Sequence, residues 1–232
     1  MSTSTSRIPT SFDRSAAITR SMLGWGVVAG PLYLAVGLAL ALTRPGFDLG
    51  RHALSLLMLG EFGWLQRVNL ALAGVMTVVA AVGMIRAIRS GRGLALGVLT
   101  SVYGGALVFG AVFPPDPMGG FPAGEPEGTA SLSGMLHLVF GALGFAAVAA
   151  AAIAYAGWSR RVGAPKRSAL GLALGAVIVL GFFGGAALST TTAGVALLWL
   201  AVLAAWTWLA VASAHVYAWS PHPLGADAAT AR

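Results

Sequence analysis

Six long apolar runs separated by short polar segments form the main pattern of this 232-residue chain. Each run is about 20 residues long, enough for a helix rising about 1.5 Å per residue to cross roughly 30 Å of hydrocarbon. The runs lie at residues 22–42, 64–85, 93–113, 132–155, 168–188 and 194–215. The pattern predicts an all-α, polytopic membrane protein with one domain, 21–217, that is a bundle of six transmembrane helices.

The two ends of the chain lack this pattern. Residues 1–20 are rich in Ser, Thr and Arg, and 218–232 form a short polar end, so we expect both to be disordered tails. The spacing of Ala39 and Ala41 resembles a signal-peptide cleavage site. The first apolar run is nevertheless longer than the roughly 7 to 15 residues of a signal peptide. It therefore favours an uncleaved first helix.

Composition and charge narrow the class of protein. Hydrophobic residues make up 57% of the chain and charged residues only 9%, too few for the surface of a soluble domain of this size. The absence of cysteine excludes disulfides and thiolate metal sites. The net charge of +7 is confined to short loops beside apolar runs, which is typical of membrane topology and argues against a nucleic-acid partner.

The basic residues also predict an orientation. Of the 14 Lys and Arg residues, only Arg44, Arg51 and Arg67 lie in or beside the odd-numbered loops, and the others flank the termini or the even-numbered loops. Positive residues favour the cytoplasmic side, so both termini are expected in the cytoplasm of a multi-pass protein of the plasma (inner) membrane. The loops after the first and third helices are then on the outer side.

Glycines recur four residues apart within the apolar runs, for example at Gly26 and Gly30 and at Gly171 and Gly175. Small residues at this spacing let two helix backbones approach closely. Packing inside the bundle is the favoured interpretation, and an oligomer formed through these glycine-rich faces remains an alternative.

The first outer loop contains an unusual density of polar groups. Asp48 is placed to cap a short interfacial helix over residues 49–59. On such a helix Asp48, His52 and Ser55 would share one face, with Arg51 beside them.

Other polar side chains are expected at the same end of the bundle. Gln66 and Asn69 lie in the first turns of the second helix, His137 lies about one turn into the fourth, and Asp116 lies in a Pro- and Gly-rich loop. We expect a polar pocket between the second, third and fourth helices, covered by both outer loops. Its candidate residues are Asp48, Arg51, His52, Ser55, Gln66, Asn69, Asp116 and His137.

These motifs suggest a family. The segment FDLGRHALSLLMLGEFGWLQRVN, followed by FPPDPMGGFP and by the histidine of GMLH, resembles the domain of unknown function 998, a family of six-span prokaryotic membrane proteins. The resemblance covers about residues 23–217. It implies a six-helix fold and points to the same eight candidate residues, but it implies no established activity.

Three classes of function fit these observations. The pocket could bind a small molecule or a lipid headgroup, or the polar cluster could have a structural or sensor role, with Arg51 paired to Asp48 or Asp116. Alternatively, the protein could be a small-molecule transporter, although the centres of the helices lack the charged residues that ion coupling uses. Whether the protein is an enzyme stays open.

The enzymatic alternative is a metal-dependent hydrolase acting on a lipid-like substrate. His52, Asp116 and His137 could hold Zn²⁺ with an open position for a reactive water, although no HExxH motif is present. A nucleophile triad of Ser55, His52 and Asp48 would have poor geometry on one short helix. No cofactor is certain, and zinc is the one considered.

Overall fold

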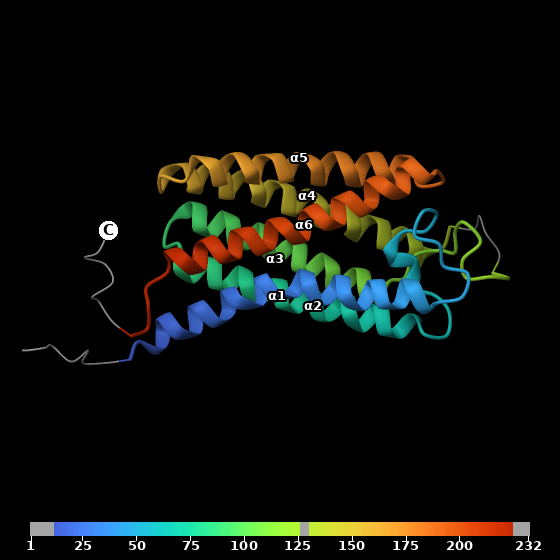
Figure 1. The fold of residues 1–232 in the computed structure, drawn as a ribbon, viewed down its shortest axis with the longest axis horizontal. Helices are drawn as coiled ribbons and strands as arrows, with labels where there is room; N and C mark the ends of the chain where they lie inside the picture. The colour runs from blue at the N-terminus through green and yellow to red at the C-terminus, as the bar shows by residue number, and fades with distance from the viewer. Residues whose placement is uncertain (1–11, 126–129, 225–232) are drawn as a thin grey trace, which may run out of the picture.

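The computed structural model describes residues 12–125 and 130–224, and its regular elements are all helical. Six of them are long and apolar enough to cross a membrane, which confirms the predicted all-α, six-helix fold (Figure 1). A short 3₁₀ helix, η1, lies between the first two. In chain order the elements are α1 (Arg14–Thr43), η1 (Leu54–Met58), α2 (Gly63–Ala87), α3 (Gly91–Val112), α4 (Leu132–Arg161), α5 (Pro165–Ala187) and α6 (Thr192–Trp219).

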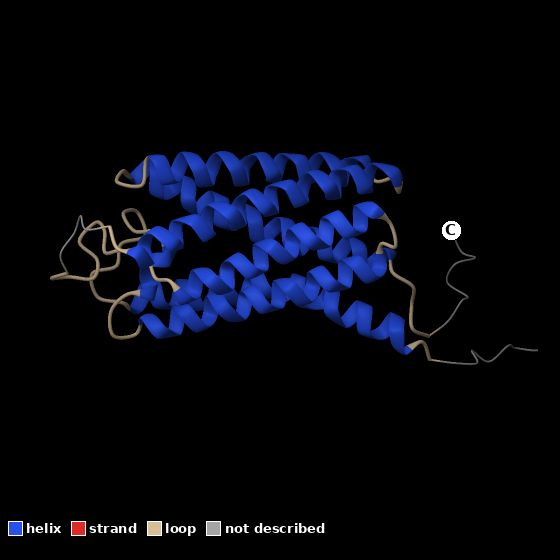
Figure 2. Ribbon diagram, turned by 180° about the vertical axis from the view of Figure 1, so that it is seen from behind, coloured by secondary structure: helices blue, strands red, loops and turns tan. Residues whose placement is uncertain are grey.

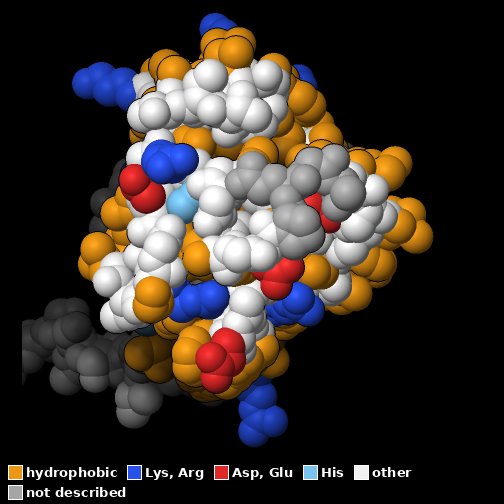
Figure 3. Space-filling view, turned by 90° about the vertical axis from the view of Figure 1, so that its right-hand side faces the viewer, with side chains coloured by type: hydrophobic (Ala, Val, Ile, Leu, Met, Phe, Trp, Pro, Cys, Tyr) orange, Lys and Arg blue, Asp and Glu red, His pale blue; other side chains and the backbone are white. Residues whose placement is uncertain are grey.

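The helices form a closed ring. Each packs against the next helix in the chain, and α6 returns to pack against α1 (Figures 1 and 2). The beginning of α1 and the end of α6 lie at one end, which we call the terminal end. The α1–α2 loop, the α3–α4 loop and η1 lie at the opposite end, which we call the long-loop end. There, charged side chains of both signs lie among polar and backbone atoms, whereas hydrophobic side chains cover the flanks (Figure 3).

Glycines allow the close approach of helices in this ring. A Cβ atom on Gly74 of α2 would lie 2.7 Å from the carbonyl oxygen of Gly104 in α3, and the converse distance is also 2.7 Å. Gly26 and Gly30 of α1 face Ser213 and Trp206 of α6 in the same manner. The glycine spacing seen in the sequence is therefore used for packing within the bundle.

The first helix begins earlier than the apolar pattern predicts, at Arg14 rather than at residue 22. Asp13 caps it by accepting a hydrogen bond from the backbone N–H of Ala16 (3.0 Å). Arg20 donates to the carbonyl of Ser220 (3.0 Å), so parts of both predicted tails are ordered against each other. The remaining parts of those tails, 1–11 and 225–232, lie outside the described residues.

The predicted interfacial helix over 49–59 is shorter and differently placed. The structure contains a 3₁₀ helix at Leu54–Met58, and all of its residues except Ser55 are buried in the mouth of the bundle. Asp48 does not cap it, because its Oδ1 accepts the backbone N–H of Gly50 (2.7 Å) in a local turn. The single helical face predicted for Asp48, His52 and Ser55 therefore does not form.

Candidate functional site

His52 links the two long loops, the α1–α2 loop and the α3–α4 loop, by hydrogen bonds. Its Nδ1 accepts the backbone N–H of Asp48 (2.8 Å), and its Nε2 lies 2.9 Å from the carbonyl oxygen of Gly119 in the α3–α4 loop. A carbonyl only accepts, so Nε2 carries the proton and donates it. The ring is 2% exposed and contacts the rings of Phe47 and Phe121, with centroid separations of 5.2 and 5.5 Å. Neither nitrogen is free to bind a metal or act as a base.

Arg44 reinforces the same junction. Its guanidinium donates to the carbonyl of Leu59 (2.8 Å) and lies 5.5 Å from the centre of the Phe121 ring. Burial lowers the pKa of Arg44, and the negative charge of Glu61 opposes that shift. The contacts of Arg44, His52 and the ring of Phe121 thus fix the conformation of the α1–α2 loop, which covers this end of the bundle.

Asp116 caps α4. Its carboxylate accepts the backbone N–H (3.0 Å) and the hydroxyl (2.5 Å) of Ser131, whose Oγ accepts the N–H of Gly134 (3.0 Å). A side chain at Gly134 would overlap the carboxylate, so this glycine makes room for it. The negative charge is favourable beside the first turn of α4, where the helix dipole is positive.

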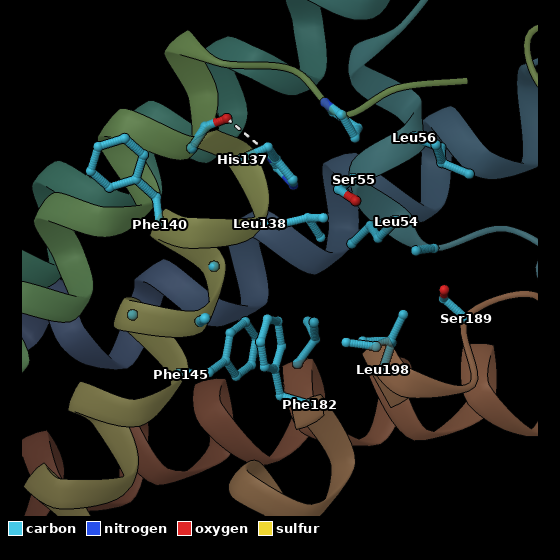
Figure 4. A pocket seen from close by; sticks show the side chains of 18 of the residues that line it. Leu54, Ser55, Leu56, His137, Leu138, Phe140, Phe145, Phe182, Ser189 and Leu198 are labelled. Atoms are coloured by element: carbon cyan, nitrogen blue, oxygen red, sulfur yellow. Dashed lines mark hydrogen bonds between the residues drawn. The ribbon is translucent and has the colours of Figure 1, made fainter. Parts of the chain in front are cut away.

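His137 differs from His52 because only one of its nitrogens is bonded. Its Nδ1 donates to the carbonyls of Phe113 (2.9 Å) and Gly110 (3.2 Å) at the end of α3. In the neutral ring, Nε2 then presents a lone pair, and within the described residues nothing bonds to it. Figure 4 shows the unbonded side of this ring turned towards a space bordered by Ser55 and Leu138.

Gln66 and Asn69 face the interior of the bundle. The Gln66 amide donates to the Tyr33 hydroxyl (3.2 Å), and the Asn69 amide donates to Gln66 Oε1 (3.1 Å) and to the Tyr33 carbonyl (3.0 Å). Both amides are buried, at 0% and 5% exposure. They join α2 to α1 and position Tyr33, whose side chain reaches the cavity described next.

A cavity of about 840 Å³ lies at the long-loop end, between the neighbouring halves of α3, α4, α5 and α6. Its roof is formed by η1 and the α3–α4 loop. Most of its wall is apolar and aromatic, from Tyr33, Tyr103, Phe140, Phe145, Phe182, Phe183, Trp199 and Trp206. Polar side chains gather towards its roof, from Ser55, Asp116, His137, Ser189 and Thr190. None of the described residues that line it is Lys or Arg.

The cavity differs from the predicted pocket in position and composition. α5 and α6 provide much of its wall, whereas α2 contributes only Leu70. Of the eight candidates, Ser55, Asp116 and His137 line it, and Asp48, Arg51, His52, Gln66 and Asn69 do not. The aromatic residues of α4 to α6 were missed because, in an apolar run, an inward-facing ring has the same pattern as one that faces lipid.

Arg51 lies beside a smaller polar cavity of about 250 Å³, together with Gly119 and Thr190 to Thr192. Its side chain is exposed. In the part of the chain that the structure describes, Arg51 forms no ion pair with Asp48 or Asp116. The ion pair of Arg51 with one of these carboxylates, which was expected if the polar cluster had a structural role, is therefore wrong.

The metal site and the triad suggested by the sequence do not match this geometry. Across residues 12–125 and 130–224, no three His, Asp or Glu side chains are grouped so that they could hold a metal ion. His52 also has no free lone pair, because one nitrogen donates and the other accepts. Asp48 meets the His52 ring through its backbone N–H and not through its carboxylate, as a triad would require.

The comparisons with known proteins give a family and no activity. No curated protein and no solved structure matches the chain. A family model described as "Protein of unknown function (DUF998)" matches residues 27–215. That range runs from near the middle of α1 into the last turns of α6 and includes the long-loop end. The chain therefore belongs to this family of proteins of unknown function, DUF998.

Proposed function

We propose that this membrane protein binds one lipid-like, amphipathic molecule in the 840 Å³ cavity. The apolar part of the ligand lies among the aromatic side chains, and its polar head lies near Ser55 and His137. The observation that carries the proposal is the lining itself, which is mostly apolar and aromatic within the bundle and has Ser55, Asp116 and His137 gathered at one end. A cavity of about 300 to 1,000 Å³ with a few convergent polar groups is typical of ligand sites.

The walls of the cavity favour an apolar guest. The rings of Phe145 and Phe182 stack with centroids 4.2 Å apart, which fixes α4 against α5 beside the cavity. Leu138 and Phe183 line the cavity and are also exposed, at 62% and 44%. We infer that the cavity opens sideways near these two residues, onto a flank that lipid covers. A lipid could enter by this route without leaving the bilayer.

The polar groups favour a head that donates hydrogen bonds and carries no negative charge. The Nε2 lone pair of His137 and the carboxylate of Asp116 are acceptors. Because no described lining residue is Lys or Arg, a phosphate or carboxylate head would have no cation to pair with, and Asp116 would repel it. An alcohol, an amide or an amine is the matching head chemistry.

The orientation of the site follows from the positive residues. Arg86, Arg89 and Arg92 lie near the α2–α3 junction at the terminal end, and Arg160 and Arg161 end α4 there. By the positive-inside rule, these residues support an orientation with the long-loop end on the outer face of the plasma membrane. The ligand would be drawn from the outer leaflet, and binding there suits a sensor or a lipid-binding protein.

The other hypotheses have weaker support. A zinc-dependent hydrolase would need a donor set other than His52, Asp116 and His137, because His52 is engaged in joining the loops. A transporter would need a route to the terminal end, where glycine contacts such as that of Gly97 with Ala81 bring the helices together.

The test is a titration of purified protein in nanodiscs with a long-chain alcohol, followed by tryptophan fluorescence. Trp199 and Trp206 line the cavity and report on its occupancy. The Gly110→Leu variant is designed to fill the cavity, since a Cβ there meets nothing closer than Leu70 Cδ2 at 3.9 Å. We expect its affinity for the alcohol to fall at least about tenfold, the loss of about 1.4 kcal/mol of binding energy.

Gly105→Leu is the matched control. It places the same side chain on the same helix, and a Cβ there has nothing within 4 Å and does not line the cavity. Its affinity should equal that of the parent protein. Saturable binding that survives unchanged in Gly110→Leu, or no saturable binding in the parent, would contradict the proposal.

A further inference from the structure

The inner part of the cavity contains a hydroxyl without a partner. Tyr103 is 1% exposed and lines the cavity, yet in the part of the chain that the structure describes its hydroxyl makes no hydrogen bond. Two other buried tyrosines are bonded, Tyr33 to Gln66 (3.2 Å) and Tyr155 to His215 (2.9 Å). A polar group that faces a cavity without a protein partner is a position where a ligand can supply the missing hydrogen bond.

A second donor lies near Tyr103. Tyr33 and Tyr103 both line the cavity, and their rings both pack against Trp206, with centroid separations of 5.2 and 6.0 Å. The Tyr33 oxygen accepts from the amide of Gln66, so its own O–H is not used in that bond. The Gln66–Asn69 pair holds it in position. Two phenol O–H groups are thus available beside the apolar wall.

These groups lie deeper than the polar roof. Tyr103 precedes Gly110 by seven residues on α3, and the His137 ring is bonded to the Gly110 carbonyl. At about 1.5 Å per residue, the level of Tyr103 is about 10 Å further from the long-loop end. The cavity therefore has two polar levels separated by aromatic and aliphatic surface.

We propose that the ligand carries a second oxygen, a carbonyl within its apolar body, which accepts a hydrogen bond from Tyr103 with Tyr33 as a second donor. This inference rests on the proposed function and adds the class of ligand: an uncharged lipid with a donating head and an oxo group about 10 Å along its chain. Tyrosine is suited to this role because it donates from a rigid, largely apolar side chain.

The experiment compares two probes in nanodiscs, a long-chain alcohol and its mid-chain keto derivative labelled with ¹³C at the carbonyl. Affinity comes from tryptophan fluorescence and the hydrogen bond from the infrared band of the labelled carbonyl. We expect the keto probe to bind the parent protein roughly threefold to tenfold more tightly than the alcohol, as one additional hydrogen bond permits. Its carbonyl band should be shifted to lower frequency than in an apolar solvent.

The Tyr103→Phe variant removes only the hydroxyl. It should lose both the preference for the keto probe and the shift of the band to lower frequency. Tyr155→Phe is the matched control, because Tyr155 is a buried tyrosine that does not line the cavity. It should keep the preference and the shift.

The possible failures can be told apart. Equal affinity of the parent protein for the two probes, or a shifted band that persists in Tyr103→Phe, would overturn this inference and leave the proposed function intact. A preference lost equally in Tyr155→Phe would also overturn it, because the effect would then be a general one on the bundle. Failure of both probes to bind the parent protein would overturn the proposed function, and this inference with it.

Discussion

The two ends of this bundle are built from similar apolar helices and differ in how tightly they pack around α3. Towards the terminal end, a Cβ on Gly97 of α3 would lie 2.8 Å from the carbonyl oxygen of Ala81 in α2. Towards the long-loop end of the same helix, a Cβ on Gly110 meets nothing closer than 3.9 Å, and the 840 Å³ cavity lies beside it. The presence of glycine alone therefore does not indicate close packing.

The path of α6 explains the difference. The later part of α6 packs closely against α1 at Gly26 and Gly30. The first part of α6 packs closely against α5, where a Cβ on Gly181 or on Gly185 would lie 2.8 Å from a carbonyl oxygen of α6. The helix thus crosses from α5 to α1 along the bundle (Figure 1). Between Gly30 and the long-loop end, η1 instead of α6 packs beside α1, with Leu54 against Gly37. The cavity is the space that η1 leaves unfilled.

The largest expected effect comes from a matched pair of substitutions on α3 that exploits this difference. Gly97→Leu should destabilise the protein by about 3 kcal/mol or more, because the new side chain overlaps Ile85 and the backbone of α2. Gly110→Leu should cost far less, because its side chain enters the cavity. Thermal unfolding in detergent measures both. Equal losses of stability would mean that the two halves are packed alike.

A second prediction concerns His52, which links two loops at the long-loop end. His52→Ala removes two hydrogen bonds and a ring packed between aromatic side chains, so we expect a loss of about 2 kcal/mol. Hydrogen exchange should rise in both long loops, 44–62 and 113–125, and not in α5. The melting temperature and the exchange of these peptides are the measurements.

His137→Ala is the comparison for that variant. It loses bonds to two carbonyls of α3 but leaves the junction of the loops in place. We expect a smaller loss of stability and weaker binding of the long-chain alcohol, by a factor of about two to ten. If His52→Ala weakened binding more than His137→Ala while leaving the melting temperature unchanged, the assignment of the two histidines would be reversed.

The smallest expected effect is at Asp116. Asp116→Ala removes the acceptor for the N–H and hydroxyl of Ser131 at the start of α4, and losing such a cap costs about 1 kcal/mol. Asp116→Asn keeps an acceptor oxygen and should cost less. Thermal unfolding of both variants checks this. A loss as large as that of Gly97→Leu would show that the long-loop end contributes as much to stability as the packed half does.

The sequence by itself determined the class of the molecule. Apolar run length alone identifies the six membrane-spanning helices, because a helix in hydrocarbon must satisfy its own backbone hydrogen bonds and needs a fixed length to cross. The motif around His52 and the Pro- and Gly-rich segment also indicated the family and the end of the bundle where polar groups gather. Those features depend on residues that are near one another in the chain.

Only the tertiary structure decided which of those polar groups face a cavity. His52 and His137 look alike in the sequence, but their roles are set by distant carbonyls, Gly119 for one and Gly110 for the other. The structure has a short 3₁₀ helix where a longer helix after Asp48 was expected, because Leu54, Leu57 and Met58 are buried between α1 and α2. Hydrogen-bond partners and burial are set by packing between distant segments, and no local pattern records them.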